Sequence, residues 1–281
     1  MKLYKTTYLL FILQTIYCQN LSRQFGNFSE AVSFAVNNIG YIYVCDSGNN
    51  EVIKFDSRGK KIVSIGGYGW EASAFDYPSH VFASPLNVYV TDKNNNRIQI
   101  FDKDLNYLSS INSDENTDSD YSFHYPSETV VSGIGDLFIL DSDNSRILKF
   151  DLKGNFILEI GGNNADESSL SDPESFVISK YLKLFVVDDN KIIVFDQYGN
   201  FLSEFEFEFT IKKVNAFENY LLLINNSEII IYNVNELNKD LFHVSNKQLN
   251  SKDEIKDAIL KNNKLYVLFP TQINVYDFVI K

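Results

Sequence analysis

Clusters of aspartate and asparagine recur between short apolar runs of this 281-residue chain, and their oxygen atoms are the first candidates for binding a ligand. The segment Asp141-x-Asp143-x-Ser145 has the spacing that opens a calcium-binding loop. Arg146 then occupies the position that needs glycine, and Leu152 that of the bidentate acid. We therefore expect no metal and no cofactor, and we expect the aspartates that open the clusters to cap turns. These aspartates are Asp46, Asp92, Asp141 and Asp188.

Two arginines, Arg97 and Arg146, directly follow such clusters. Their simplest role is to pair with a neighbouring acid, and an exposed pair of this kind contributes ~0 to 1 kcal/mol. A catalytic role for either arginine has no substrate geometry to support it.

Three residues near the starts of expected strands are the candidates for catalysis if the chain is an enzyme. Glu128, Glu174 and His80 would then serve a metal-assisted hydrolase or lyase. The alternative is that the two glutamates are solvated or cap turns. Other catalytic patterns, namely Gly-x-Ser-x-Gly, His-Glu-x-x-His and a phosphate-binding glycine loop, do not occur. We expect that the chain is not an enzyme.

The elements that position these residues follow from an internal repeat. A Phe-Asp pair or a weaker echo of it recurs every 37 to 49 residues, which is the period of a four-stranded propeller blade. The six markers are Phe55-Asp56, Phe101-Asp102, Phe150-Asp151, Phe195-Asp196, Tyr232-Asn233 and Tyr276-Asp277. The repeats predict an all-β, six-bladed β-propeller of four-stranded antiparallel blades.

The third repeat shows the order of strands within a unit. We expect strands over 128–132, 137–141, 146–151 and 156–160, separated by turns rich in Asp, Asn and Gly. The second strand, Leu137-Phe-Ile-Leu140, is apolar on both faces, as expected for a sheet between two neighbouring sheets. The stretch from Asn250 to Leu260 has some helical spacing but is short.

The two ends of the chain are expected to complete one blade. The last repeat has only Phe278 to Lys281 after its marker, so its fourth strand is missing. The segment from Leu21 to Gly26 resembles the end of a fourth strand and precedes the first repeat. We therefore expect the N-terminal strand to close the sixth blade, which removes open sheet edges.

The segments Asp46 to Asp56, Asp92 to Asp102 and Asp141 to Asp151 resemble the NHL repeat, as do Phe75-Asp-Tyr-Pro78 and Phe123-His-Tyr-Pro126. The resemblance is clear over residues 29–205 and degenerate afterwards. It implies a six-bladed propeller. Its secreted members include amidating lyases that hold zinc with several histidines, whereas this chain has only His80, His124 and His243. The residues after the repeated prolines are Ser79, Ser127 and Glu174, which are not the histidine of the lyase pattern.

Exposed aromatic residues would suit a binding surface. Tyr68 and Trp70 lie in a glycine-rich insertion over residues 66–75, and Tyr77 and Tyr125 precede the repeated prolines. Tyrosine and tryptophan are enriched in binding hot spots. The alternative for Trp70 is that it fills the gap between two blades.

Charge and the N-terminal residues bear on partners and location. A net charge of −12 opposes nucleic acid, whose binders carry basic patches. Residues 1–18, with Lys2 and Lys5 before an apolar run that ends near Cys18, are expected to be a signal peptide, or else a buried first strand. One propeller domain then covers 19–281, without a transmembrane helix. Asn20, Asn27 and Asn225 begin glycosylation triplets.

These features lead to one hypothesis and one alternative. We expect a secreted, monomeric, non-enzymatic glycoprotein. It would present a face of loops to a protein, peptide or glycan partner. The alternative is a metal-assisted hydrolase or lyase that uses the central channel.

Overall fold

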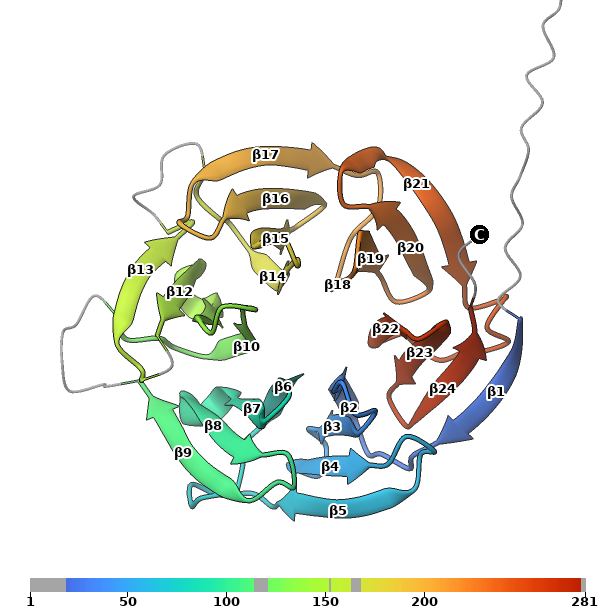
Figure 1. Cartoon of the computed structure of the whole chain (residues 1–281), viewed down its shortest axis with the longest axis horizontal. Helices are drawn as coiled ribbons and strands as arrows, with labels where there is room; N and C mark the ends of the chain where they lie inside the picture. The colour runs from blue at the N-terminus through green and yellow to red at the C-terminus, as the bar shows by residue number, and fades with distance from the viewer. Residues whose placement is uncertain (1–18, 114–120, 152, 163–167, 279–281) are drawn as a thin grey trace, which may run out of the picture.

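The computed structural model describes residues 19–113, 121–151, 153–162 and 168–278, and these residues form six four-stranded antiparallel sheets around a central axis (Figure 1). The predicted signal peptide, residues 1–18, lies outside this part of the chain. We call the sheets blades 1 to 6 and their strands a to d from the axis outward. Strand a is thus the innermost strand of each blade and strand d the outermost.

The strands of each blade follow one another in the chain. Blade 1 contains β2 (Ala31–Val36), β3 (Ile42–Asp46), β4 (Glu51–Phe55) and β5 (Lys61–Gly66), and blade 2 contains β6 (Pro78–Ala83), β7 (Asn87–Asp92), β8 (Arg97–Asp102) and β9 (Tyr107–Asn112). Blade 3 contains β10 (Pro126–Val131), β11 (Leu137–Asp141), β12 (Arg146–Phe150) and β13 (Phe156–Ile160). Blade 4 contains β14 (Pro173–Ile178), β15 (Lys183–Asp188), β16 (Lys191–Asp196) and β17 (Phe201–Glu206). Blade 5 contains β18 (Lys213–Phe217), β19 (Tyr220–Ile224), β20 (Glu228–Asn233) and β21 (Glu236–Ser245).

Blade 6 joins the two ends of the described chain, as the sequence predicts. It contains β22 (Asp257–Lys261), β23 (Lys264–Phe269) and β24 (Gln272–Asp277), and β1 (Gln19–Phe25) is its outermost strand (Figure 1). β1 pairs with β24 in antiparallel register, from Gln19 opposite Asp277 to Phe25 opposite Ile273. The ring is therefore closed by hydrogen bonds between segments about 250 residues apart in the chain.

The strand predictions for the third repeat agree closely with the structure. β11 and β13 have the predicted bounds, and β12 ends one residue earlier. β10 begins two residues before the predicted strand, because Pro126 already pairs with Asp141. The stretch with helical spacing is not a helix: β22 is extended and pairs with β23, burying Ala258 and Leu260.

The hydrophobic core consists of layers between neighbouring blades. One apolar cluster contains Tyr43 and Cys45 of blade 1 together with Val81 and Val90 of blade 2. Comparable clusters lie between the blades of each remaining adjacent pair. Cys45 is a free, fully buried thiol in this layer. Strand b is buried on both faces because a blade lies on each side of it, which explains its uninterrupted apolar sequence.

The blades give the disc two different faces. We call the face with the b–c turns and the loops between blades the loop face, and the face with the a–b and c–d turns the turn face. Two short 3₁₀ helices, Lys93–Asn95 and Ser142–Asn144, form b–c turns on the loop face. In the described residues, no helix is both long and apolar enough to cross a membrane.

Candidate functional site

The aspartates at the ends of strand b hold the loops that enter each blade. The Asp92 carboxylate accepts a hydrogen bond from the backbone N–H of Asp76, and that of Asp141 accepts one from His124. The carboxylate of Asp46 accepts a hydrogen bond from the backbone N–H of Ser29, and that of Asp188 accepts one from Ser171. The side chains of all four aspartates are buried. The predicted hydrogen bonds from these side chains to backbone exist, but the prediction that the aspartates cap their own turns was wrong. The backbone amides that these carboxylates accept belong to the preceding interblade loop, not to the aspartate's own turn.

Arg97 and Arg146 pair with these buried aspartates. Each Nε lies 2.8 Å from a carboxylate oxygen, of Asp92 and Asp141 respectively, and both carboxylates are fully buried. The expected ion pairs exist, and their carboxylates are buried, so the value for an exposed pair does not apply. A pair with a buried carboxylate is screened less by solvent than a surface pair.

The insertion over residues 66–75 is fastened to blade 2 and presents two exposed aromatic rings. Arg97 donates hydrogen bonds to the backbone oxygens of Trp70, Glu71 and Ala74, and the Asn95 side chain donates to that of Gly69. Despite these anchors, 74% of Tyr68 and 66% of Trp70 is exposed. Trp70 therefore does not fill a gap between blades.

Tyr77 and Tyr125 occupy equivalent places in two successive interblade loops, the first of which also contains the insertion. Both have left-handed backbones, with φ of 59° and 46°, and each backbone N–H donates to an asparagine of the preceding blade, Asn50 or Asn96. Their side chains are 38% and 49% exposed. All four aromatic residues chosen from the sequence thus lie on the loop face, three in the loop between blades 1 and 2 and one in the next.

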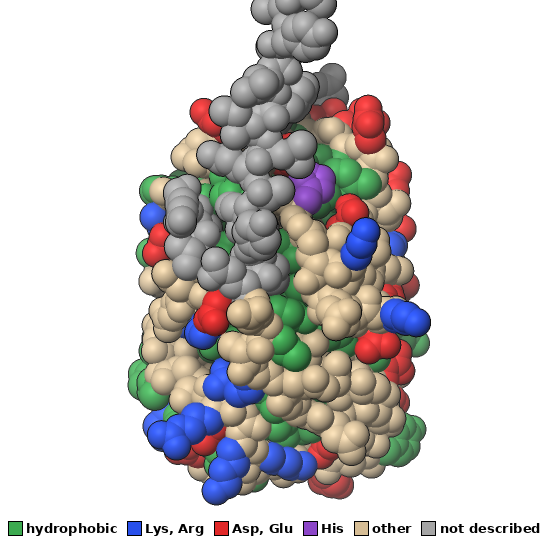
Figure 2. Space-filling model, turned by 90° about the vertical axis from the view of Figure 1, so that its right-hand side faces the viewer, with side chains coloured by type: hydrophobic (Ala, Val, Ile, Leu, Met, Phe, Trp, Pro, Cys, Tyr) green, Lys and Arg blue, Asp and Glu red, His purple; other side chains and the backbone are tan. Residues whose placement is uncertain are grey.

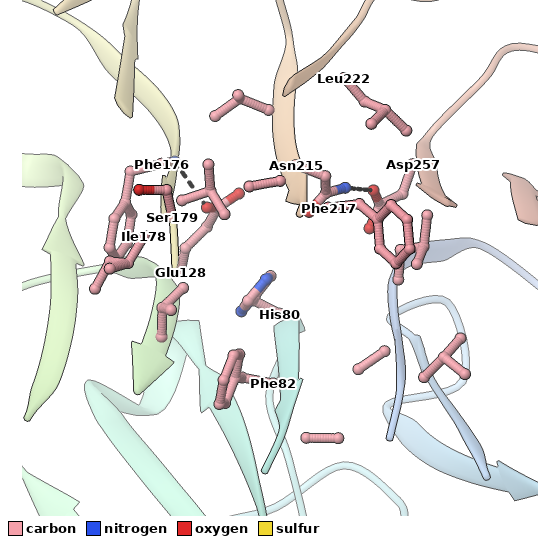
Figure 3. A pocket seen from close by; sticks show the side chains of 18 of the residues that line it. His80, Phe82, Glu128, Phe176, Ile178, Ser179, Asn215, Phe217, Leu222 and Asp257 are labelled. Atoms are coloured by element: carbon pink, nitrogen blue, oxygen red, sulfur yellow. Dashed lines mark hydrogen bonds between the residues drawn. The ribbon is translucent and has the colours of Figure 1, made fainter. Parts of the chain in front are cut away.

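A second site lies on the axis, where the innermost strands place six polar residues at one level. Each pairs with the equivalent residue of its neighbouring strand b, for example His80 with Thr91 and Lys213 with Ile224. We call them the polar ring: Ser33, His80, Glu128, Ser175, Lys213 and Asp257, all buried. Figure 3 shows His80 pointing into the channel between Glu128 and Asp257.

The polar ring accepts hydrogen bonds from backbone amides around the channel. The innermost strand of a blade has an unpaired edge, so its N–H groups need other acceptors. Ser33 accepts the amide of Val81, His80 that of Thr129, Glu128 that of Phe176 and Ser175 that of Val214. Each of these four acceptors thus bonds a backbone amide of the next blade in the chain. The series stops at Lys213, which cannot accept, and Asp257 accepts the amide of its own neighbour, Ala258.

Lys213 sets the electrostatics of the ring. Its Nζ lies 2.5 Å from Glu128. Burial favours the neutral form of Glu128, but the charge of Lys213 outweighs it and holds the pKa of Glu128 below its usual value. Burial, with Lys213, lowers the pKa of His80 to about 3. Burial raises the pKa of Asp257 to about 6. His80 is therefore neutral, and its Nε2 carries the proton because Nδ1 accepts the Thr129 amide.

The structure brings together two of the three residues assigned to a possible enzyme. His80 and Glu128 share the ring, whereas Glu174 pairs with Lys212 outside it, at 2.5 Å. The expectation that Glu128 is solvated or caps a turn was wrong, since it is 4% exposed and paired with Lys213. Lys213 and Asp257 could not be singled out from the sequence because the last two repeats are degenerate. Their register becomes visible only through strand pairing.

The remaining histidines do not join this site. The backbone N–H of His124 bonds Asp141, and His243 is exposed and lies 2.9 Å from Asp240. Among the described residues, no three side chains of His, Cys, Asp or Glu are close enough together to hold a metal ion.

A cavity of about 440 Å³ extends from the polar ring towards the turn face. Its walls are mainly apolar side chains of the innermost strands, including Phe82, Ile178, Phe217 and Ile259 (Figure 3). Lys180 and Lys261 lie where the a–b turns surround its mouth.

No family model matches the chain, but individual proteins do. Protein brain tumor of Drosophila melanogaster is 30% identical over 146 residues, 50% of this chain and 13% of that protein. Probable peptidyl-alpha-hydroxyglycine alpha-amidating lyase pgal-1 of Caenorhabditis elegans is 30% identical over 154 residues, 53% of this chain and 41% of that protein. The matched segment thus spans less than half the length of either relative.

Solved structures show the same architecture. A gluconolactonase from Xanthomonas campestris has a TM-score of 0.67 at 9% identity, over 89% of this chain and 87% of that chain. Virginiamycin B lyase from Staphylococcus aureus has a TM-score of 0.62 at 12% identity, over 92% and 99%. At such identities these likenesses show the fold alone. The ring of six blades makes the chain a six-bladed β-propeller, and its repeats and the two relatives show that it resembles NHL-type propellers.

Proposed function

We propose that the protein is a binding module that recognises a protein, peptide or glycan through its loop face. The observation that supports this proposal best is the insertion over residues 66–75. Tyr68 and Trp70 are among the most exposed large apolar side chains, yet the backbone beneath them is hydrogen-bonded to Asn95 and Arg97. A surface fixed before the partner arrives loses less conformational entropy on binding.

The same construction recurs at the end of this loop and in the next interblade loop. Tyr77 and Tyr125 have their backbones fixed by asparagines of the preceding blades, and their rings are partly exposed. Aromatic rings on rigid loops offer a large contact area at low entropic cost. They can stack on the face of a sugar or pack against an apolar side chain.

Charge favours partners other than nucleic acid. The chain carries 37 acidic and 25 basic residues. Figure 2, which views the edge of the disc over blade 6, shows charges of both signs among uncharged side chains rather than a continuous basic stripe. The expected signal sequence would direct the protein to the secretory pathway or out of the cell. We propose that it acts there as a monomer. Of its glycosylation triplets, Asn20 and Asn27 are exposed, and Asn225 is half-buried.

The test compares loop-face and turn-face variants of the purified protein on glycan and peptide arrays. Tyr68→Ala with Trp70→Ala removes the two exposed rings, and Tyr198→Ala removes an equally exposed ring, 67%, from a c–d turn on the opposite face. We expect specific array signals to fall at least tenfold in the double variant and to persist in the control. Equal losses in both variants, or arrays without a specific signal, would contradict the proposal.

A further inference from the structure

The cavity beneath the polar ring is a second site, on the face opposite the aromatic loops. It has about 440 Å³, within the range of small-molecule sites. Its walls come from the innermost strands of all six blades, so it is as rigid as the ring itself. Phe82, Ile178, Phe217 and Ile259 make the middle of the cavity apolar.

The mouth of the cavity carries two positive charges, and no acid among the described residues forms an ion pair with either. Lys261 Nζ donates to the backbone oxygens of Val36 and Asn37 and to the amide oxygen of Asn38, all neutral acceptors. Lys180 lies over the ring of Tyr181, 5.1 Å from its centroid. Within the described part of the chain, neither ammonium lies within 4.0 Å of a carboxylate. Burial lowers the pKa of Lys261, as expected for a cation held without an anionic partner.

Exposed apolar side chains lie on the same face as this mouth. The a–b turns of blades 1 to 4 present Ile39, Leu86, Ile134 and Tyr181, each more than half exposed. The a–b turns of blades 5 and 6 instead carry Glu218 and two asparagines, Asn262 and Asn263. An apolar molecule therefore finds exposed apolar groups on the face where the cavity opens. Such a patch marks an interaction site more often than an inert surface.

The inner end of the cavity has the opposite charge. Glu128 and Asp257 face the single charge of Lys213, while His80 is neutral, so the polar ring is negative once Asp257 is ionised. An anionic group is repelled from this end and attracted by Lys180 and Lys261 at the other. Only a molecule with an apolar body and an anionic end at the mouth satisfies both ends and the walls.

We propose that the cavity binds a single-chain amphiphile with an anionic head group, its chain inside and its head between Lys180 and Lys261. A fatty acid and a single-chain phospholipid share this chemistry. The site does not depend on the loop face, so Tyr68→Ala with Trp70→Ala should leave it unchanged. Failure of one proposal is thereby distinguishable from failure of the other.

Calorimetric titration with dodecanoate, dodecyl phosphate and dodecyltrimethylammonium, below their micelle concentrations, tests the head group. We expect both anions to bind at least tenfold more tightly than the cation of equal chain length. A preference between the two anions distinguishes a carboxylate source from a phosphate source. Each two methylenes added from octanoate to dodecanoate should increase affinity on the order of tenfold.

Variants test the location. Lys180→Glu should weaken dodecanoate binding about tenfold, whereas Lys153→Glu, the same charge change at an exposed c–d turn, should not. Ala83→Phe and, independently, Ala216→Phe should fill the cavity and abolish binding of every probe, with thermal melting confirming that each variant folds. Absence of binding by the unmodified protein would overturn the proposal, as would equal affinity for anion and cation. Full binding by either folded cavity variant would overturn it as well.

Discussion

Blades 1 to 4 and blades 5 and 6 reach the same shape through different contacts. In the first four, a buried aspartate at the end of strand b accepts amides of the loop that enters the blade. In blade 5 the equivalent residue, Asn225, bonds its own turn, to Ser227 and Glu228. The loops around blades 5 and 6 instead donate to backbone oxygens, as Ile255 does to Asn226.

The difference shows which part of the repeat the fold requires. Apolar layers of similar character join every pair of adjacent blades, including blades 5 and 6. The aspartate anchor is present only where the repeat is easy to recognise. We infer that the interblade layers determine the propeller, whereas the aspartates fix the conformation of the loops on the loop face, where the proposed binding residues lie.

The largest expected effect comes from opening the ring. Deletion of residues 19–25 removes β1 and leaves β24 as an exposed edge, and it also removes Phe25 from its contact with Phe55. We expect the free energy of unfolding to fall by more than about 4 kcal/mol, beyond the range of ordinary single substitutions. Urea unfolding measures it. A deletion variant as stable as the whole propeller would show that the closure of blade 6 is unimportant.

The next effect compares the two kinds of blade directly. Asp92→Ala leaves Arg97, Gln99 and the Asp76 amide without their shared acceptor, and we expect a loss of about 3–5 kcal/mol. Asn225→Ala, at the equivalent place in blade 5, removes only bonds within one turn and should cost about 1 kcal/mol. Denaturant unfolding of both variants measures the difference. Equal costs would mean that blades 1 to 4 do not depend on the aspartate anchor.

Within the polar ring, two groups should give opposite dependences on pH. Asp257 has its pKa raised from 3.8 to about 6, so the folded state binds the proton more tightly and stability falls as pH rises through this window, by about 3 kcal/mol. His80 has its pKa lowered from 6.5 to about 3, so the unfolded state binds the proton more readily than the folded state. The free energy of unfolding therefore falls as pH falls from 6.5. The neighbouring charges are Glu128 and Lys213.

Two variants separate these contributions. Relative to the unmodified protein, Asp257→Asn should gain stability as pH is raised from 4 to 7. His80→Gln, which keeps an acceptor for the Thr129 amide, should gain relative stability as pH is lowered. Unfolding measured across this range checks both slopes. Parallel profiles for the two variants would contradict the assignment.

The fold was predictable from the sequence because each blade repeats the same local pattern. The Phe-Asp markers predict the number of blades, and the resemblance of Leu21 to Gly26 to a fourth strand predicts the closure. The polar ring was not predictable. No residue type is common to all six positions, and only strand register places them at one level. The six residues are Ser33, His80, Glu128, Ser175, Lys213 and Asp257. The sequence also did not determine whether the side chain of Trp70 is exposed, since an indole ring can either fill the gap between two blades or face solvent.

The smallest expected effect is at Glu174, one of two glutamates that the sequence did not distinguish. Glu128 is buried and paired with a buried lysine, so Glu128→Gln should cost several kcal/mol because Lys213 then lacks a counter-charge. Glu174 and Lys212 are 28% and 47% exposed, and Glu174→Gln should change stability by only ~0 to 1 kcal/mol. The two variants remove the same charge from a buried and from a partly exposed ion pair, and urea unfolding of both measures the difference. A loss at Glu174 as large as that at Glu128 would show that burial does not decide the contribution of these carboxylates.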